Sequence, residues 1–281
     1  MRKTRYPALG KVSILSLYMN NLDQTAHGLR IGLALGGGAA RGFAHIGVLK
    51  VLEEENIPVH MVAGTSVGSL VGSLYCAGFR WREIASFTKD VNWGQLAKPI
   101  WPTNGLVSSE KLEQTLNSVL KSSTFAELRL PFRAVAVDIS QGEVVVLGNG
   151  AVAPAVRASC SIPGIFTPTE IDGRMLVDGG VLNSVPADVV RAMGADVVIA
   201  VNLNSDRKKN GKPENVIDML FYSFNLMVSK NTETTLKAAD FVIEPDLRDL
   251  GYYSLKKHDV AIARGEAAAR RVIEQIRERI S

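Results

Sequence analysis

Three short segments of this 281-residue chain combine glycine with side chains that can take part in a reaction. They read GGGAARG at residues 36–42, GTSVG at residues 64–68 and DGG at residues 178–180. Serine is a nucleophile once a base takes its proton, a carboxylate can be that base, and glycine N–H groups can stabilise an oxyanion. Each segment follows an apolar run typical of a β-strand, so all three are expected at strand ends.

Ser66 occupies the centre of the GTSVG segment, whose GxSxG spacing is that of a nucleophile elbow. A strand predicted at 60–63 precedes the serine, and a helix predicted at 67–77 follows it. This context presents the hydroxyl on a sharp turn at a helix N-terminus, where developing negative charge is stabilised. The spacing alone is equally typical of an ordinary helix N-cap, and it is the flanking strand and helix that favour a nucleophile.

A serine nucleophile needs a base, and histidine is the usual one. The chain has four histidines: His27, His45, His60 and His258. None has the loop setting typical of a triad histidine, although His45, in the helix after the glycine loop, comes nearest. Asp178 follows an apolar run at 175–177 and precedes two glycines. By itself it would be a turn residue, but beside a nucleophile it predicts a Ser66–Asp178 dyad.

The glycine cluster at 36–38 has two chemical interpretations besides a simple turn. Glycine lets a ligand approach backbone N–H groups at a helix N-terminus, which suits either a phosphate or an oxyanion. A nucleotide site fits poorly, because the loop ends in Arg41 where a Walker loop has lysine followed by serine or threonine. The dinucleotide pattern also lacks a glycine, since Ala39 stands at that position.

Apolar runs rich in valine and isoleucine alternate with helical stretches along the chain. The sequence predicts strands at 31–35, 60–63, 132–139, 144–147, 175–177, 197–202 and 241–244. It predicts helices at 42–55, 67–77, 82–90, 109–120, 151–159, 186–193, 214–229 and 260–279. This alternation implies a three-layer α/β sandwich with a mostly parallel central sheet.

We expect residues 1–28 to form an N-terminal extension and residues 29–281 to form one domain. The polar stretch at 204–213 is expected to be a surface loop rather than a domain boundary. Aromatic residues of two stretches are expected to pack within the fold: Trp81, Trp93, Trp101, Tyr252 and Tyr253. For the tryptophan-containing stretch at 79–102, a lid or an acyl-chain entrance is the alternative.

The composition favours a globular protein and argues against nucleic-acid-binding and membrane-spanning classes. With 46% hydrophobic and 21% charged residues, the chain resembles soluble globular proteins. Its net charge of +4 is compatible with an anionic phospholipid surface but too diffuse for nucleic-acid binding. No apolar run reaches the ~18–20 residues that cross a bilayer. Cys76 and Cys160 are expected to be buried free thiols, which fits a cytoplasmic protein without a metal site.

The three motifs occur in one order, each after a predicted strand, and ASCSIPGIF stands at 158–166 before the aspartate. In these features the chain, from about residue 31 to residue 259, resembles the patatin-like phospholipase family, especially its compact bacterial members. The resemblance implies that Ser66 attacks an ester carbonyl, and that Asp178 takes the serine proton and later activates water. No metal or other cofactor is expected, because the sequence has no cluster of metal-ligand residues.

The resemblance also implies roles for the glycine loop. The N–H groups of Gly37 and Gly38, with that of Ala39, would bind the oxyanion. Alanine disfavours positive φ, so the glycine that many relatives have at this position is the easier residue there. Arg41 would hold the loop or steer a phosphate head group, and its alternative is a structural donor to nearby carbonyls.

The chain is therefore expected to be a serine esterase that hydrolyses lipid acyl esters, like a phospholipase, through an acyl-enzyme. Its expected partners are a lipid or another acyl ester and, peripherally, a membrane surface, with no nucleic acid. One alternative is a thioesterase or short-chain esterase, because the size of an acyl pocket depends on packing. The other is a non-catalytic regulatory protein that keeps the same scaffold.

Overall fold

A mixed sheet forms the centre of the computed structural model, which describes residues 28–90, 98–99, 107–205, 215–251 and 257–281. The sheet has eight strands in the order β10-β9-β1-β2-β5-β8-β7, and β6 also lies along β5. The strands are β1 (Ile31–Leu35), β2 (Met61–Thr65), β5 (Phe132–Asp138), β6 (Glu143–Leu147), β7 (Thr169–Ile171), β8 (Arg174–Asp178), β9 (Val197–Val201) and β10 (Phe241–Ile243). A separate short pair joins β3 (Lys98–Pro99) to β4 (Val107–Ser108).

The strands from β10 to β5 pair in parallel, whereas β6, β7 and β8 are antiparallel to their neighbours. Strands β1, β2 and β9 are buried along their whole length, as expected where helices cover both faces of a parallel sheet. Ile31, Leu33, Leu35 and Ile199 face one layer, whereas Ala34, Ala63 and Ala200, with Met61 and Val198, face the other. Alternate residues of these strands therefore belong to two separate hydrophobic clusters.

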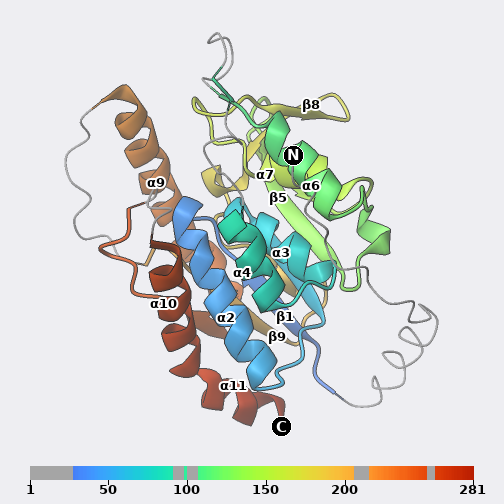
Figure 1. Cartoon of the computed structure of the whole chain (residues 1–281), viewed down its shortest axis with the longest axis vertical. Coiled ribbons are helices and arrows are strands. Elements are labelled where there is room, and N and C mark those ends of the chain that lie inside the picture. The colour runs from blue at the N-terminus through green and yellow to red at the C-terminus, as the bar shows by residue number, and fades with distance from the viewer. Residues whose placement is uncertain (1–27, 91–97, 100–106, 206–214, 252–256) are drawn as a thin grey trace.

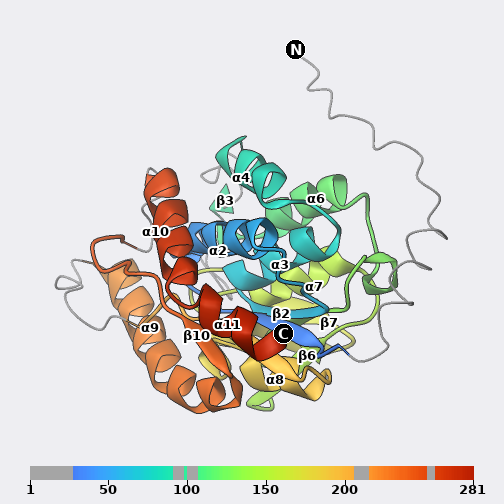
Figure 2. The same cartoon turned by 90° about the horizontal axis from the view of Figure 1, so that it is seen from below.

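The helices are α2 (Phe43–Glu54), α3 (Val67–Cys76), α4 (Trp81–Asp90), α6 (Glu110–Val119), α7 (Val152–Ser159), α8 (Ala187–Ala192), α9 (Val216–Thr235), α10 (His258–Arg270) and α11 (Ile273–Ile280). Helices α2, α3 and α7 lie on one side of the sheet and α8 on the other (Figures 1 and 2). No helix within the described ranges is both long enough and apolar enough to cross a membrane.

The predicted three-layer α/β sandwich is confirmed, and most predicted elements end within one or two residues of the observed ones. Several details differ, and one of them is the short β3–β4 pair, which was not predicted. The helix predicted at 260–279 is two helices, because the chain turns at 271–272. Helix α9 runs six residues past its predicted end at 229, and β7 was not predicted. Predictions for the 1–28 extension, Trp93, Trp101 and the two tyrosines lie outside the described residues, apart from residue 28.

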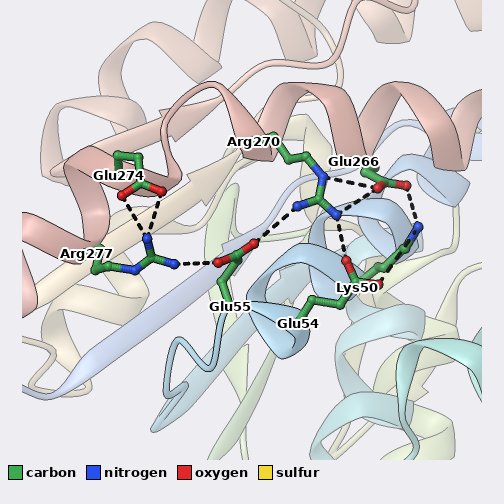
Figure 3. A network of polar contacts seen from close by, with 7 residues as sticks. All are labelled: Lys50, Glu54, Glu55, Glu266, Arg270, Glu274 and Arg277. Carbon is green, nitrogen blue, oxygen red and sulfur yellow. Dashed lines mark hydrogen bonds and ion pairs between the residues drawn. The ribbon is translucent and has the colours of Figure 1, made fainter.

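Helix α2 is held against α10 by very close backbone contact and by ion pairs. A Cβ atom on Gly47 would lie 1.9 Å from the Ile262 oxygen, so only glycine fits. At the C-terminal end of α2, Glu54, Glu55 and Lys50 join a network with α10 and α11 (Figure 3). Since the glycine loop leads directly into α2, this packing fixes the helix that carries the loop.

Candidate functional site

Ser66 lies between β2 and α3 in a strained backbone conformation. Its φ is 54° and its ψ is −127°, values that a non-glycine residue rarely adopts and that cost about 1–3 kcal/mol. Its carbonyl accepts hydrogen bonds from the N–H of Ser69 at 2.8 Å and of Leu70 at 3.2 Å, which begins α3. Its N–H donates to Ser159 Oγ at 2.9 Å. The predicted strand–turn–helix elbow is therefore present in the structure.

The two glycines of the elbow motif are required by space. A Cβ atom on Gly64 would lie 2.4 Å from the Gly68 oxygen. A Cβ atom on Gly68 would lie 2.0 Å from the Leu35 oxygen, because α3 begins directly against the end of β1. Both distances are far below van der Waals contact, so the GxSxG spacing reflects how closely the backbone packs here.

Strand β5 explains how Asp178 reaches Ser66 from far along the chain. Parallel β2 ends at Thr65, opposite Val135 of β5. Antiparallel β8 ends at Asp178, opposite the next residue, Ala136. Because β6 occupies the other edge of β5 over these residues, β2 and β8 must share one edge. Their ends meet there, and the serine and the aspartate both leave the sheet at that point.

The Asp178 carboxyl group is fully buried. Its Oδ1 accepts a hydrogen bond from the Gly180 N–H at 2.8 Å, while Oδ2 has no hydrogen-bond partner among the described residues. Burial raises the pKa of this carboxyl from 3.8 to about 7, although the nearby Ser66 side chain and the Gly180 N–H act in the opposite direction. Near neutral pH the group can therefore both take up and release a proton.

The glycine loop is held by its first two residues. The Gly36 N–H donates to the Val201 oxygen at 3.1 Å, and the Gly37 N–H donates to the Ser184 oxygen at 3.0 Å. His45 donates from Nε2 to the Gly36 oxygen at 2.8 Å, and burial lowers its pKa to about 4, so its ring is neutral. The Gly37 N–H, predicted to bind an oxyanion, is thus already engaged, and His45 supports the loop rather than Ser66.

The next two N–H groups of the loop differ from that of Gly37. No acceptor among the described residues takes a hydrogen bond from the N–H of Gly38 or Ala39. Ala39 has a φ of 47°, so this alanine adopts the conformation that was expected to be unfavourable for it. These two groups are the unused donors of the loop.

Arg41 is a structural residue in this fold. Its side chain is 3% exposed, and its Nε donates to the Leu250 oxygen at 2.9 Å. Its Nη1 lies 3.5 Å from the Leu203 oxygen, the acceptor of a second, longer contact. The guanidinium group ties the loop to two distant segments, as the structural alternative predicted. Because it is buried, it does not present its charge to a head group.

A narrow cleft joins these groups. It is lined by Gly37, Gly38, Ala39, Ser66, Ile162, Asp178, Gly180, Ser184, Asn204, Phe224, Asn225 and Val228. The room open to the centres of water molecules is about 10 Å³, which is enough for about one water. Phe224 and Val228 of α9 pack over it against Ile162. The cleft is therefore closed by α9 in this conformation.

A larger hollow of about 370 Å³ lies at the other end of α2, around Glu53 and Trp81. It is lined mostly by charged side chains and includes neither Ser66 nor Asp178. Trp81 has the cations of Lys50 and Arg82 over its ring, at 5.4 and 4.5 Å from the centroid. This tryptophan therefore packs against the rest of the fold and does not line the cleft. Of the two roles predicted for it, packing is the one that the structure supports.

The described histidines do not contact Ser66. His60 Nδ1 accepts a hydrogen bond from the Ile31 N–H at 2.9 Å, at the opposite end of β2, and His258 Nε2 lies 2.9 Å from the Thr88 hydroxyl. Within the described ranges, no three histidine, cysteine, aspartate or glutamate side chains are placed to hold a metal ion. Among the described residues that line the cleft with Ser66, Asp178 is the one with an acidic or basic side chain.

Both cysteines are free thiols, and Cys76 is buried as expected. Cys160 is partly buried and borders the site, with its Sγ 3.9 Å from Ser69 Oγ. Burial and the nearby Asp178 raise the pKa of its thiol, so it stays protonated. Sequence reasoning gave no role to its neighbour Ser159 or to Ser184, although Ser159 stands in the ASCSIPGIF stretch that marked the family resemblance.

The chain is similar in sequence to known proteins. An uncharacterized NTE family protein of Mycobacterium tuberculosis is 37% identical over 178 residues, which are 62% of this chain and 49% of that protein. Human patatin-like phospholipase domain-containing protein 6 is 36% identical over 198 residues, 66% of this chain but 14% of that protein. The chain thus spans about half the length of the mycobacterial relative and far less of the human one.

A likeness in fold extends to a solved structure. VipD from Legionella pneumophila superimposes with a TM-score of 0.53 over 88% of this chain and 67% of that one, at 12% sequence identity. The family model described as patatin-like phospholipase matches residues 33–191, which is more than half of the chain and includes the glycine loop, the elbow and the aspartate. The chain belongs to the patatin-like phospholipase family.

Proposed function

We propose that this chain is a serine esterase that hydrolyses lipid acyl esters through an acyl-enzyme on Ser66, with Asp178 as its base. One observation carries the proposal. A serine in a strained elbow lies beside a fully buried carboxyl whose pKa is raised to about 7 and whose Oδ2 has no partner among the described residues. Such an arrangement is costly to fold and useful for proton transfer. Membership of the family supports a lipid as substrate.

The reaction would proceed in two steps. Ser66 Oγ attacks the ester carbonyl carbon while its proton passes to the Asp178 carboxylate. The tetrahedral intermediate collapses, the C–O bond to the alcohol breaks, and Asp178 returns the proton to the departing oxygen. Water then attacks the acyl-enzyme and gives a proton to Asp178, and the second collapse releases the carboxylic acid as the proton returns to Ser66.

The negative charge of each tetrahedral intermediate needs donors that are already in place. The N–H groups of Gly38 and Ala39 are our candidates, because both line the cleft and neither is used elsewhere in the described structure. The Gly37 N–H is left out, since it donates to the Ser184 oxygen. Its proposed contribution is to hold the loop in position.

An ester can enter only if the cleft widens. The cleft has room for about one water molecule, and an acyl ester is many times larger. The groups that α9 places over Ser66 are apolar, namely Phe224 and Val228, with Ile162 opposite. These side chains suit contact with an acyl chain better than with a charged group. They do not show which substrate class is preferred among phospholipids, thioesters and short esters.

Cytoplasmic location and peripheral membrane contact remain predictions from the sequence.

Hydrolysis by two variants tests the proposal. Ser66→Ala and Asp178→Asn should each lower kcat for a chromogenic acyl ester by about 10³-fold or more, because each removes a participant in proton transfer. Ser73→Ala is the matched control: this serine is also buried in α3, but its hydroxyl donates to the Leu70 oxygen, away from the cleft. The control should keep kcat within about threefold of the wild type. Undiminished turnover by folded Ser66→Ala would refute the proposed mechanism, whereas no turnover by the folded wild-type protein would favour a non-catalytic scaffold.

A further inference from the structure

We infer that Ser159 is a positioning residue that holds the nucleophile elbow in its reactive conformation, an inference that rests on the proposed function. Ser159 ends α7 and is completely buried. Its Oγ accepts a hydrogen bond from the Ser66 N–H at 2.9 Å and donates one to the Val135 oxygen at 2.6 Å. It does not line the cleft, so it acts through Ser66 and not on the substrate.

The Ser66 N–H needs this acceptor because of where the elbow begins. The parallel pairing of β2 with β1 ends at Gly64, and its pairing with β5 ends at Thr65. The positive φ of Ser66 then turns the chain away from the sheet. The residue is 7% exposed, which leaves its N–H little access to water. A buried N–H without an acceptor is costly, so loss of Ser159 Oγ would favour other backbone conformations of the elbow.

The second hydrogen bond of Ser159 gives the first its direction. A serine hydroxyl has one proton, and here that proton is committed to the Val135 oxygen. Toward the Ser66 N–H, Oγ can therefore act only as an acceptor.

The acceptor of the Ser159 hydroxyl, the Val135 oxygen, lies on the strand that joins the serine to the aspartate. Val135 lies opposite Thr65 in the sheet, and the next residue of β5, Ala136, lies opposite Asp178. Ser159 thus fastens the nucleophile to the two-residue stretch of β5 where the strands carrying the serine and the aspartate meet. This connection couples the position of Ser66 to that of Asp178. A shift of about 1 Å between reacting groups can cost on the order of 10²-fold in rate.

A purely structural serine would behave differently. Ser73 is equally buried, and its hydroxyl bonds to the backbone of its own helix at Leu70. Removal of the Ser73 hydroxyl takes one hydrogen bond from the interior and removal of the Ser159 hydroxyl takes two, so both variants should have a lower Tm, with the larger decrease in Ser159→Ala. Only removal of the Ser159 hydroxyl should change the reactivity of Ser66.

The test compares Ser159→Ala, Ser159→Cys and Ser73→Ala in the full chain. Measured for each are Tm, kcat and KM for a chromogenic acyl ester, and the rate of labelling by a fluorophosphonate. Ser159→Ala should lower kcat and the labelling rate together by about 10- to 100-fold, with KM within about twofold. Ser159→Cys places a thiol of similar volume, a weak acceptor, at this position, and its kcat should fall at least about threefold. Ser73→Ala should lower Tm and leave kcat, KM and the labelling rate unchanged.

The outcomes separate this inference from the function on which it rests. If Ser66→Ala is inactive and folded Ser159→Ala keeps wild-type kcat, the positioning role is wrong and the esterase stands. If Ser159→Ala does not fold, wild-type kcat in Ser159→Cys overturns the role. If Ser73→Ala loses kcat as strongly as Ser159→Ala, the effect is a general result of destabilisation and the inference fails. If Ser66→Ala keeps full activity, the proposed function fails first.

Discussion

The two ends of α2 use polar groups in opposite ways. Beside the N-terminal end lie two strained residues, Ala39 and Ser66, and the buried carboxyl of Asp178, one oxygen of which has no hydrogen-bond partner among the described residues. At the C-terminal end, Lys50, Glu54 and Glu55 are paired with charges of α10 and α11 at the protein surface (Figure 3). The same helix thus connects a region that is costly to fold with a region whose charges are satisfied.

The difference teaches that burial raises the pKa of a carboxyl, whereas hydrogen bonds from cations lower the pKa of a carboxyl near the surface. One carboxyl at the buried end has its pKa raised to about 7, and burial is the largest cause. In the network, hydrogen bonds from Lys50 and Arg270 are enough to lower the pKa of Glu266, because that carboxylate remains partly exposed to water. Exposed ion pairs contribute little to stability. Functional consequences should therefore concentrate at the buried end.

The largest effect expected from this comparison is a dependence of activity on pH. Asp178 acts as a base only when ionised, and its pKa is raised to about 7. The kcat/KM of the wild type should therefore rise with pH, fall about tenfold per unit below pH 7, and level off above it. A pH–rate profile that stays flat from pH 5 to pH 8 would contradict this, and would place the base elsewhere.

Stability provides the control for that profile. Since the folded-state pKa of Asp178 is raised from 3.8 to about 7, the unfolded chain loses this proton first. The contribution of the group to stability is therefore full below about pH 4, declines as pH rises to about 7, and is constant above. Asp178→Asn cannot ionise and should lose that component of the pH dependence while remaining inactive.

The smallest effect is expected in the network. Arg270→Ala removes contacts to Glu54, Glu55 and Glu266, all at partly exposed positions. It should lower Tm by no more than about 5 °C, less in 1 M NaCl, and leave kcat within about twofold. A tenfold loss of kcat would show that α2 transmits the state of the network to the glycine loop, and the contrast between the two ends would then fail.

The sequence predicted what depends on local pattern. Glycine spacing, apolar runs and flanking helices located β1, β2, α3 and the residues at their junctions, because strand–turn–helix units are encoded within a few residues. The antiparallel strand β7 was missed because it has three residues and no alternation long enough to recognise. The break at 271–272 was missed because no glycine or proline marks it.

In the site, too, local motifs predicted some features and long-range contacts determined the others. Ser66 and Asp178 were predicted from their motifs, but their approach depends on the register of two strands on β5, which spacing along the chain does not encode. The same holds for Gly37, whose N–H is taken by the oxygen of Ser184, 147 positions later. Closure of the cleft by α9 is also a long-range packing result. Local patterns thus name the reactive groups, whereas tertiary contacts decide which donors stay free.

The central claim is that Ser66 is a nucleophile activated by the carboxyl of Asp178. Its most direct test is labelling of the folded protein with a fluorophosphonate, followed by mass spectrometry of the peptide that carries the adduct. One adduct on Ser66 is expected, absent from Ser66→Ala and formed at least about 10²-fold more slowly in Asp178→Asn. An adduct on another serine, or none on folded wild-type protein under conditions that label a known serine esterase, would contradict the claim.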